Sequence, residues 1–298
     1  MFYGNWMSCI KDEAKLTEIA IPGSHNSGTK GMNMFGRCQN GTLYEQAMYG
    51  VRKFDLRVRT DRKGRLFIAH SIIKGITVEE AFADIRRILE DTDEFLILNI
   101  KTYAVQDIGP FVMRFKGSDE AVSELIEKHL NPEEYALTDF DDIRSVTMGD
   151  VRKSGKRYVI HSEKEEYKYS RNCHILEPWE PEVFGYKPEK FAKECLRYLK
   201  ALDSKGFFWF QTQQTPGPGT ENGIGKWPVQ LDKLDRPYFS QIMADIAADP
   251  VMLKKVNIVA GDFMTEDYMK VNEILNFNLL KGVVKEDRIQ EYKAAIGK

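Results

Sequence analysis

Two histidines stand directly after short strand-like segments, where their imidazole rings could transfer protons in a reaction. His25 lies in the segment IPGSHNSGT, and His70 ends the segment RLFIAH. An imidazole has an unperturbed pKa of about 6.5, so it can accept or donate a proton near neutral pH. A single histidine in a loop is more often a surface or core-edge residue than a catalyst. The small residues around His25 leave room for a substrate, which favours a catalytic role for this histidine.

Charged residues near further strand ends could join the histidines. Asp55 and Arg57 are two residues apart in RKFDLRVR and therefore share one face of a strand. Lys101 and Asp262 lie near the ends of two later strand-like segments. In a barrel of parallel strands the carboxyl ends meet at one mouth, so these four side chains would surround the two imidazoles. Each charge taken alone could equally be a solvated residue at a strand end.

The elements that must position these residues alternate along the chain. Segments rich in β-branched and aromatic residues predict strands over 16–23, 52–59, 65–70, 94–103, 156–161, 206–213 and 256–263. Amphipathic patterns predict helices over 77–92, 118–130, 187–202 and 266–280. The first of these helices has Thr77 as N-cap and Glu80 three residues later, which is the pattern of a capping box.

This alternation indicates parallel β/α units. We therefore expect residues 1–298 to form one domain of the α/β class, a single irregular (β/α)8 barrel of the TIM type. Two departures from a regular barrel are expected. One is a hairpin over residues 55–70 with DRKG at its turn, and the other is a long loop over residues 215–237.

The composition excludes several function classes. The 298 residues carry a formal net charge of -2, so no overall charge attracts nucleic acid or an anionic membrane. A hydrophobic fraction of 42% and a mean hydropathy of -0.44 are typical of a globular domain, and no run approaches the ~20 apolar residues of a membrane helix. The four cysteines show no metal-ligand spacing, and we expect free thiols or one pair. The first residues lack the pattern of a secretory signal, which leaves the localisation open.

Several motifs together resemble one known family, the X-domain of phosphatidylinositol-specific phospholipases C, and its bacterial branch in particular. IPGSHNSGT resembles the first-histidine motif of that family, and YGVRKFDLRVR followed by LFIAHS resembles its second segment. FLILNIK and NIVAGDF are similar to its third and last strands, and NWMS and CQN also occur in bacterial members. The resemblance is dense over residues 5–105 and thinner beyond. It implies a TIM-type barrel that cleaves phosphatidylinositol or its glycosylated anchors.

The resemblance also implies a role for each charged residue. His25 would be the general base on the inositol 2-hydroxyl, with Asp262 orienting its ring, and His70 the general acid on the diacylglycerol oxygen. Arg57 occupies a position that is acidic in the calcium-dependent branch, so its guanidinium would replace the cation. Asp55 would hold Arg57 or the 2-hydroxyl region. The reaction would need no metal and no other cofactor, and its product would be a cyclic 1,2-phosphate.

Head-group recognition departs from the bacterial pattern. That pattern has an aspartate after the first histidine, which assists the acid, whereas this chain has Asn26. Asn26 could hydrogen-bond His70 but could not raise its pKa by charge. The inositol-contacting arginine of the family aligns with His161 and Ser162 and is absent. Lys101 would contact the inositol hydroxyls. Glu177 and Trp179 would stand for the acidic and the aromatic residue with which the family contacts inositol.

Two apolar loop tips are candidates for contact with a membrane surface. Met32, Met34 and Phe35 lie in KGMNMFG, and Trp227 lies in GIGKWP. Aromatic and long apolar side chains are favoured at the interface of a bilayer. The same side chains could equally pack onto the barrel rim. The expected partners are a phospholipid substrate and, transiently, a membrane surface, but no nucleic acid, and the protein is expected to be a monomer.

Two other functions remain open at this stage. The first is a protein that binds inositol phospholipids on the same fold with little turnover, which Asn26 and the missing arginine favour. The second is a metal-dependent barrel phosphodiesterase of the glycerophosphodiester type. That class needs a cluster of carboxylates, and Arg57 stands where one would be expected. Members of the phospholipase family are usually secreted.

Overall fold

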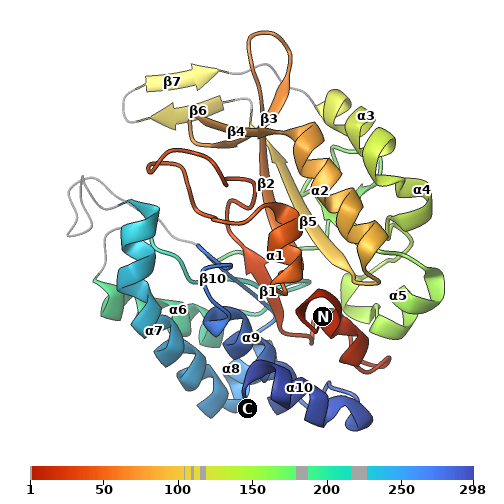
Figure 1. The fold of residues 1–298 in the computed structure, drawn as a ribbon, viewed down its shortest axis with the longest axis vertical. Helices are drawn as coiled ribbons and strands as arrows, with labels where there is room; N and C mark the ends of the chain where they lie inside the picture. Colours follow the sequence, from red (N-terminus) through yellow and green to blue (C-terminus); the bar gives the residue numbers. More distant parts are fainter. Residues whose placement is uncertain (1, 104, 109–110, 115–118, 179–186, 216–226) are drawn as a thin grey trace.

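A curled sheet of parallel strands forms the centre of the molecule (Figure 1). The computed structural model describes residues 2–103, 105–108, 111–114, 119–178, 187–215 and 227–298. The sheet runs in the order β10 (Trp209–Gln211), β11 (Ile258–Gly261), β1 (Ile21–Ser24), β2 (Lys53–Thr60), β5 (Leu96–Thr102), β8 (Tyr158–His161) and β9 (Ser170–Arg171). All neighbouring pairs along this path are parallel, so their carboxyl ends share one edge.

The sheet closes on itself through the residues after β9. The amide of Leu176 donates to the carbonyl of Phe207 at 2.9 Å, and the amide of Trp209 donates to the carbonyl of Leu176 at 2.9 Å. The segment that leaves β9 at Arg171 therefore reaches β10 five residues later, at Leu176. Because this junction is short, the sequence pattern gave no strand there. The predicted irregular barrel of the TIM type is confirmed.

The hairpin predicted over residues 55–70 is also present. β3 (Leu66–His70) runs antiparallel to the end of β2, and β4 (Ile73–Thr77) pairs with β3 outside the ring. Asp61 stabilises the turn, because its carboxylate accepts from the amides of Lys63 at 2.8 Å and Arg65 at 3.0 Å. The hairpin carries His70 back over the carboxyl edge of the barrel. A second hairpin, β6 (Val105–Ile108) and β7 (Phe111–Arg114), follows β5.

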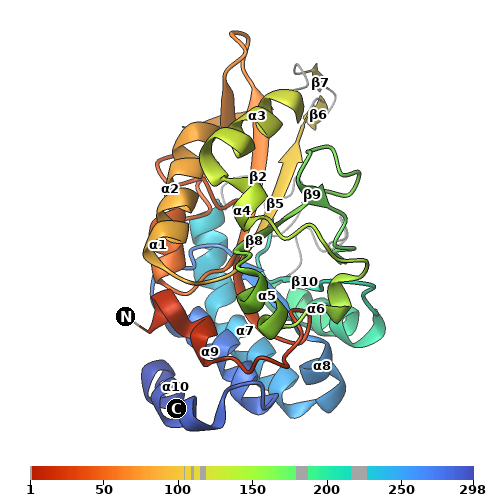
Figure 2. The same cartoon turned by 90° about the vertical axis from the view of Figure 1, so that its right-hand side faces the viewer.

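Helices cover the outside of the ring (Figures 1 and 2). They are α1 (Leu43–Met48), α2 (Val78–Asp91), α3 (Asp119–Leu130), α4 (Pro132–Tyr135), α5 (Met148–Ser154), α6 (Pro188–Ala201), α7 (Pro228–Ala248), α8 (Pro250–Lys255), α9 (Met269–Leu280) and α10 (Ile289–Ile296), with short 3₁₀ helices η1 (Tyr3–Cys9), η2 (Ile143–Ser145) and η4 (Glu286–Arg288). All four helices predicted from amphipathic patterns are present within a few residues. The capping box of α2, formed by Thr77 and Glu80, is present as predicted. No helix in the described ranges is both long and apolar enough to cross a membrane.

Two predictions about local structure were wrong. The second half of the predicted loop 215–237 is helical, because α7 begins at Pro228 and continues through Pro237. Proline suits the first helical turn, where its missing N–H has no partner to lose, but inside a helix it usually signals a break. The predicted strand 16–23 is shorter than expected. Only residues from Ile21 onward pair, and the buried Leu16 and Ile19 lie in turns before the barrel.

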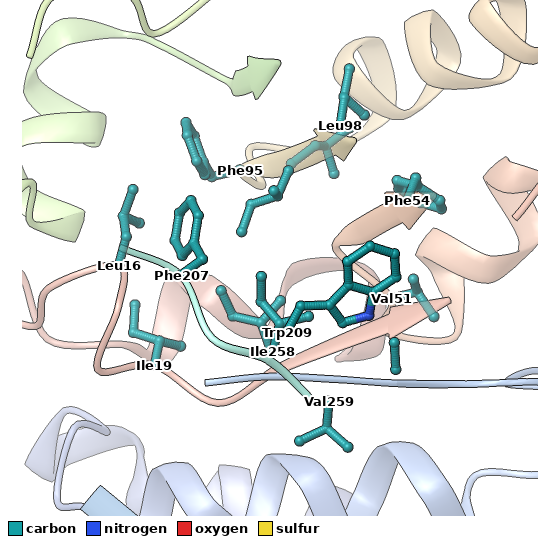
Figure 3. Packing of buried hydrophobic residues seen from close by; sticks show 14 of the residues in the cluster. Leu16, Ile19, Val51, Phe54, Phe95, Leu98, Phe207, Trp209, Ile258 and Val259 are labelled. Atoms are coloured by element: carbon teal, nitrogen blue, oxygen red, sulfur yellow. The ribbon is translucent and has the colours of Figure 1, made fainter. Parts of the chain in front are cut away.

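Alternation along the strands separates an apolar layer from a polar interior. Phe54 and Leu98 pack in the hydrophobic core, as Figure 3 shows, together with Phe207 and Phe95. Asp55, in the middle of β2, points the opposite way from Phe54, as the period of a strand requires. The four cysteines are all free and buried, so the core is built without disulfides.

Candidate active site

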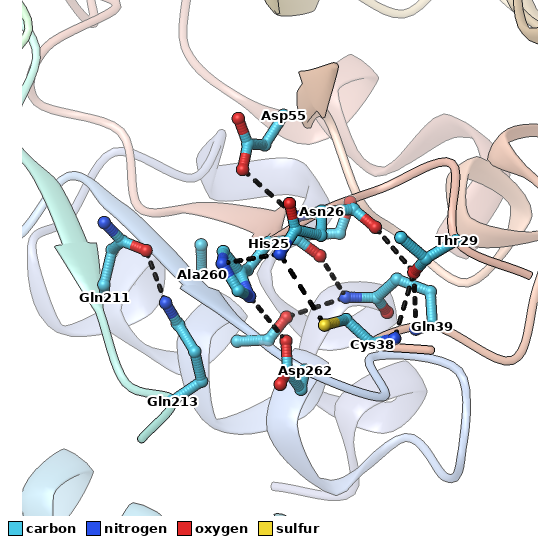
Figure 4. A network of polar contacts seen from close by, with 12 residues as sticks. His25, Asn26, Thr29, Cys38, Gln39, Asp55, Gln211, Gln213, Ala260 and Asp262 are labelled. Carbon is cyan, nitrogen blue, oxygen red and sulfur yellow. Dashed lines mark hydrogen bonds and ion pairs between the residues drawn. The ribbon is translucent and has the colours of Figure 1, made fainter. Parts of the chain in front are cut away.

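A histidine and an aspartate meet where two adjacent strands end. β1 and β11 pair with Ser24 opposite Gly261, so His25 and Asp262 are the next residues on each strand. Nδ1 of His25 lies 2.8 Å from Oδ1 of Asp262. Both residues are buried, with 8% and 3% of their surface exposed. The carboxylate thus fixes the ring and favours a proton on Nδ1, which leaves the lone pair on Nε2 (Figure 4).

Polar side chains hold the backbone around His25 in place. The side-chain amide of Gln39 donates to the carbonyls of His25 at 2.8 Å and Gly261 at 3.0 Å. The hydroxyl of Ser27 accepts from the amide of Asp55 at 2.7 Å. A Cβ at Gly28 would come within 2.8 Å of the side chain of Ile68, so only glycine fits there. These contacts join the ends of β11, β1 and β2 into one rigid edge.

Asn26 turns its side chain toward His25 rather than toward His70. Its φ of 45° is in the left-handed region, which asparagine tolerates better than most residues. Its backbone amide donates to Asp55 at 3.1 Å, and its side-chain nitrogen lies 2.9 Å from Nε2 of His25 and 3.6 Å from Sγ of Cys38. The expected hydrogen bond from Asn26 to His70 was therefore wrong, because the left-handed turn directs the amide back over the preceding ring.

Asp55 and Arg57 form a buried ion pair beside the histidines. Nε and Nη2 of Arg57 each lie 3.1 Å from Oδ2 of Asp55. Burial opposes ionisation of Asp55, but Arg57 and Lys53 outweigh it and hold the pKa of this carboxyl well below its usual range. The pKa of Arg57 is raised in turn, because the neighbouring carboxylate outweighs the effect of burial. The Arg57 side chain is still 25% exposed, so its fork can reach a ligand.

His70 faces His25 across the mouth. The two ring centroids are 6.3 Å apart and the ring planes make an angle of 80°. Nδ1 of His70 lies 2.9 Å from the carbonyl of Gly36, which places the proton of the neutral ring on that nitrogen. Burial, the neighbouring His25 ring and the guanidinium of Arg57 lower the pKa of His70 to about 4. His70 is therefore neutral at pH 7 before a ligand binds.

Lys101 extends the same mouth along β5. It stands opposite Arg57 in the register of β2 and β5. Its Nζ lies 2.9 Å from Oε2 of Glu177, and the second oxygen of Glu177 accepts from Gln211. The charges of Glu177 and Asp55 outweigh burial and raise the pKa of Lys101. Trp179 lies outside the described residues.

A cleft of about 330 Å³ opens over the ends of β5 and β8. It is lined by Asn99, Lys101, Tyr103, His161, Ser162 and Tyr167 among others. The described residues also form a larger cleft of about 600 Å³, around Lys15, Glu18 and Lys254, but it lies at the amino ends of the strands. The smaller cleft lies at the carboxyl ends of the strands, where chemistry in such barrels occurs, and adjoins the site through Asn99 and Lys101, but neither His25 nor His70 lines it.

The two apolar loop tips, which carry Met32, Met34, Phe35 and Trp227, form a rim that is partly exposed and partly packed. Met34 and Phe35 are 47% and 48% exposed, whereas Met32 is buried and is not available for membrane contact. The ring of Phe35 meets that of Trp227 edge to face, with centroids 4.2 Å apart. Phe35 therefore packs on Trp227 and still faces outward, and membrane contact at these loop tips stays a prediction.

The backbone as a whole matches solved structures of one enzyme class. The phosphatidylinositol-specific phospholipase C from Listeria monocytogenes superposes with a TM-score of 0.64 at 17% identity, covering 93% of this chain and 98% of that chain. A variant of the enzyme from Staphylococcus aureus gives a TM-score of 0.60 at 17% identity, covering 92% and 96%. The chain has the fold of the bacterial phosphatidylinositol-specific phospholipases C. The predicted resemblance is confirmed at this level.

Sequence similarity to this phospholipase fold is local. A 1-phosphatidylinositol phosphodiesterase from Staphylococcus aureus (strain Newman) is 35% identical over 74 residues, which are 23% of this chain and 24% of that protein. A PI-PLC X domain-containing protein from Dictyostelium discoideum is 27% identical over 119 residues, covering 31% and 20%. The match thus spans about a quarter of the length of the first relative. No family model matches the chain.

Sequence reasoning missed several residues of this phospholipase-like site. Cys38 and Gln39 stand in the CQN motif, which carried the resemblance but was given no role. Asn99 donates to Asp55 at 3.4 Å, and Lys270 donates to the carbonyl of Asp262 at 2.7 Å. Asn99 is two residues before Lys101 and so shares its face, which could have identified it. Nothing in the local sequence marks Lys270, because it reaches the site from α9.

Proposed function

We propose that the protein is a metal-independent phospholipase C that cleaves phosphatidylinositol or its glycosylated anchors. The products are diacylglycerol and inositol 1,2-cyclic phosphate. The observation that carries the proposal is the pairing of His25 with Asp262 while the ring centroid of His70 lies 6.3 Å from that of His25, together with the partly exposed Arg57 on Asp55. Two imidazoles on opposite sides of a small space suit a reaction that removes one proton and supplies another.

The reaction follows from the positions of the two rings. Nε2 of His25 takes the proton of the inositol 2-hydroxyl, while the Nδ1 proton remains on its bond to Asp262. The 2-oxygen then forms a bond to phosphorus as the bond to the diacylglycerol oxygen breaks. That oxygen receives its proton from Nε2 of His70, which takes up this proton when the anionic substrate binds, while the Nδ1 proton stays hydrogen-bonded to the Gly36 carbonyl. Because nucleophile and phosphate belong to one molecule, most of the entropic cost of bringing them together is already met.

Arg57 supplies the positive charge for the phosphate. A guanidinium pairs with two phosphate oxygens in one plane, and Asp55 holds it in a fixed orientation from behind. Calcium would require six to eight oxygen ligands. In the described residues, Asp55 is already occupied by Arg57, Asn26 and Asn99, so the donor set does not fit that ion. This argues against the metal-dependent glycerophosphodiester type.

Lys101 and the cleft beside it support recognition of the inositol ring. Lys101 and Glu177 offer a donor and an acceptor to ring hydroxyls, and Lys101 lies directly opposite Arg57 on the neighbouring strand. The exposed Met34 and Phe35 lie on the loop that also supplies the Gly36 carbonyl to His70. Shallow insertion of this loop into a bilayer would bring a lipid head group to the two histidines.

Phosphorus NMR on vesicles of phosphatidylinositol with a chelator tests this function. We expect the resonance of a five-membered cyclic inositol phosphate to appear, and His25→Ala and His70→Ala each to lower its rate by ~10²–10⁴-fold. Loss of turnover in chelator would identify a metal-dependent phosphodiesterase instead. Vesicle binding with no cyclic product would identify a lipid-binding protein, and either result would refute the proposal.

A further inference from the structure

The proposed base and two neighbouring side chains, all of types that commonly bind transition metals, converge at one point. One nitrogen of His25, Sγ of Cys38 and one oxygen of Asp262 lie within 4.8 Å of one another, and all three residues are buried. Among the described residues this is the one such grouping of histidine, cysteine and acidic side chains. The mechanism proposed above uses His25 and Asp262 but gives Cys38 no part.

The donor set selects the kind of cation. Nitrogen, thiolate and carboxylate together suit Zn²⁺ and its neighbours, whereas Ca²⁺ and Mg²⁺ prefer oxygen alone. Zinc bonds of about 2.0–2.3 Å put tetrahedral ligand atoms roughly 3.3–3.8 Å apart, so side-chain shifts of about 1 Å would close the site.

Asn26 offers a fourth ligand. Its Oδ1 is buried and has no hydrogen-bond partner within the described part of the chain. The nitrogen of the same amide group already contacts His25 at 2.9 Å and Cys38 at 3.6 Å. A half-turn of the amide therefore places a carbonyl oxygen between those two residues. A buried acceptor without a donor is costly, and a cation would satisfy it.

We propose that His25, Cys38 and Asp262 form an inhibitory site for a thiophilic divalent cation, with Zn²⁺ as the physiological candidate. Binding displaces the thiol proton of Cys38 to solvent and forms bonds from the metal to sulfur, nitrogen and oxygen. Coordination through Nε2 of His25 takes the lone pair that the 2-hydroxyl needs. Coordination through Nδ1 breaks the contact with Asp262 and leaves the proton on Nε2. In either case His25 stops acting as a base, a consequence that rests on the proposed function.

Cobalt provides a test that does not depend on activity. Titration of the full chain with Co²⁺ should give a 1:1 complex with a thiolate-to-cobalt charge-transfer band in the near ultraviolet. Cys38→Ala should remove the band. Cys9→Ala is the matched control, because Cys9 is equally buried but lies in η1, away from the strand ends. Absence of the band in the unaltered protein, or its survival in Cys38→Ala, would overturn the site.

Inhibition is then measured on phosphatidylinositol in detergent micelles. Zn²⁺ should suppress cleavage by the unaltered protein and by Cys9→Ala, and Cys38→Ala should need at least tenfold more Zn²⁺ for the same effect. The inhibition of each protein is expressed relative to its own cleavage rate in chelator, because Sγ of Cys38 also lies 3.7 Å from Nδ1 of His70. If no cleavage is detected at all, the proposed function fails, but the cobalt band still decides the metal site. Equal inhibition of all three proteins would show that the cation acts elsewhere and would refute the proposal.

Discussion

The side-chain nitrogen of Asn26 lies 2.9 Å from Nε2 of His25. With the Nδ1 proton committed to Asp262, this nitrogen donates to the lone pair that has to accept the proton of the substrate. The inositol 2-hydroxyl must therefore displace Asn26 before it can react. After proton transfer, the unpartnered Oδ1 of the same amide can accept from the new N–H by a half-turn. Asn26 thus suits both protonation states of the base.

Asn26→Asp should lower activity, because a carboxylate beside Nε2 stabilises the protonated imidazole and removes the free base. We expect kcat/KM to fall about tenfold to a hundredfold at pH 7, equivalent to roughly 1.4–2.8 kcal/mol, and to recover as the pH rises. Asn26→Gly tolerates the same left-handed backbone without a charge and is the control. A gain of activity in Asn26→Asp would instead support assistance of His70 by this position, as the sequence comparison suggested.

How far the sequence determines this site is clear from individual residues. His25 and Asp262 could be placed together because each follows a strand, and parallel strands align their ends. The spacing of Asp55 and Arg57 placed them on one strand face, and the family resemblance gave them their roles in the site. The direction of the Asn26 side chain could not be predicted, because it depends on a φ of 45° in a loop. The contact of Cys38 with Asn26 joins residues that are twelve apart in a loop without periodicity, so no sequence pattern predicts it.

In the fold, too, the features set by local sequence were predicted and those set by tertiary contacts were missed. Periodic segments such as 77–92 gave helices with correct caps, because side-chain alternation and capping are local. α7 was missed because Trp227-Pro228 and Pro237 suggest a loop, while its stability comes from packing on α6 and α9. The closure at Leu176 was missed because two backbone hydrogen bonds suffice there. Tertiary contacts determine the structure of these segments, and such contacts cannot be predicted from the local pattern of a single sequence.

His70 should take up a proton when an anionic head group binds. Its pKa of about 4 makes it neutral at pH 7 in the free protein, and the acid role requires a proton on Nε2. A phosphate next to the ring favours the charged form and raises this pKa. Calorimetry of inositol 1-phosphate binding at pH 6.5 in buffers of different ionisation enthalpy should show net uptake of a proton, lost in His70→Ala. The same uptake in His70→Ala would assign the proton to another group.

The low pKa of His70 also affects stability in acid. In the unfolded chain a histidine binds its proton near pH 6.5, whereas in the folded protein His70 does so only near pH 4. The unfolded state is therefore favoured progressively as the pH falls from 6.5 to 4, and this effect is absent above that window. His70→Asn should flatten the dependence of the unfolding midpoint on pH between 7 and 4. An unchanged slope would place the titrating group elsewhere.

Arg57→Lys should lose most activity although the charge is kept. A lysine offers one ammonium and cannot hold Asp55 through two nitrogens while pairing with a phosphate. We expect kcat to fall by roughly 10²-fold or more with a smaller change in KM, since the contact strengthens as the cyclic phosphate forms. Steady-state kinetics on micellar phosphatidylinositol measure both. A change in KM alone would mean that Arg57 only binds the substrate.

Lys270 should act as a positioning residue for Asp262. Its ammonium is buried, pairs with Asp232, and donates to the main-chain carbonyl of Asp262 at 2.7 Å. Lys270→Met keeps the length of the side chain and removes this donor, so Asp262 is expected to hold His25 less firmly. We expect kcat to fall about tenfold and its dependence on pH to change, because one lost hydrogen bond to a charged group is worth about 1.5–3 kcal/mol.

Lys281→Met is the matched control for Lys270→Met. The side-chain nitrogen of Lys281 also donates to backbone carbonyls, those of Glu18 and Val256, but at the opposite end of the barrel. It should lower the unfolding temperature without changing the pH profile of cleavage. If both variants reduce activity in proportion to their loss of stability, Lys270 has only a structural role.

The apolar rim should determine binding to vesicles but not the chemical step. Phe35 is 48% exposed and rests edge to face on Trp227, and the 53% exposed Ile72 follows His70 on the same side. Ile73 beside it packs against Gly36, so hairpin and loop form one surface. Phe35→Ser should weaken sedimentation with phosphatidylinositol vesicles several-fold, and Ile72→Ser should add to the loss, since each removes apolar area from the bilayer.

Turnover of a soluble substrate separates membrane binding from catalysis. Cleavage of a short-chain phosphatidylinositol that is monomeric in solution should be unchanged in Phe35→Ser, because this side chain contacts neither histidine in the described structure. Val251→Ser provides the control for surface hydrophobicity, as Val251 is 49% exposed but lies in α8, before β11. It should leave vesicle binding unaltered. Equal losses for Phe35→Ser and Val251→Ser would mean that the protein meets lipid without a preferred face, and the rim would then have no role in delivering the head group to His25.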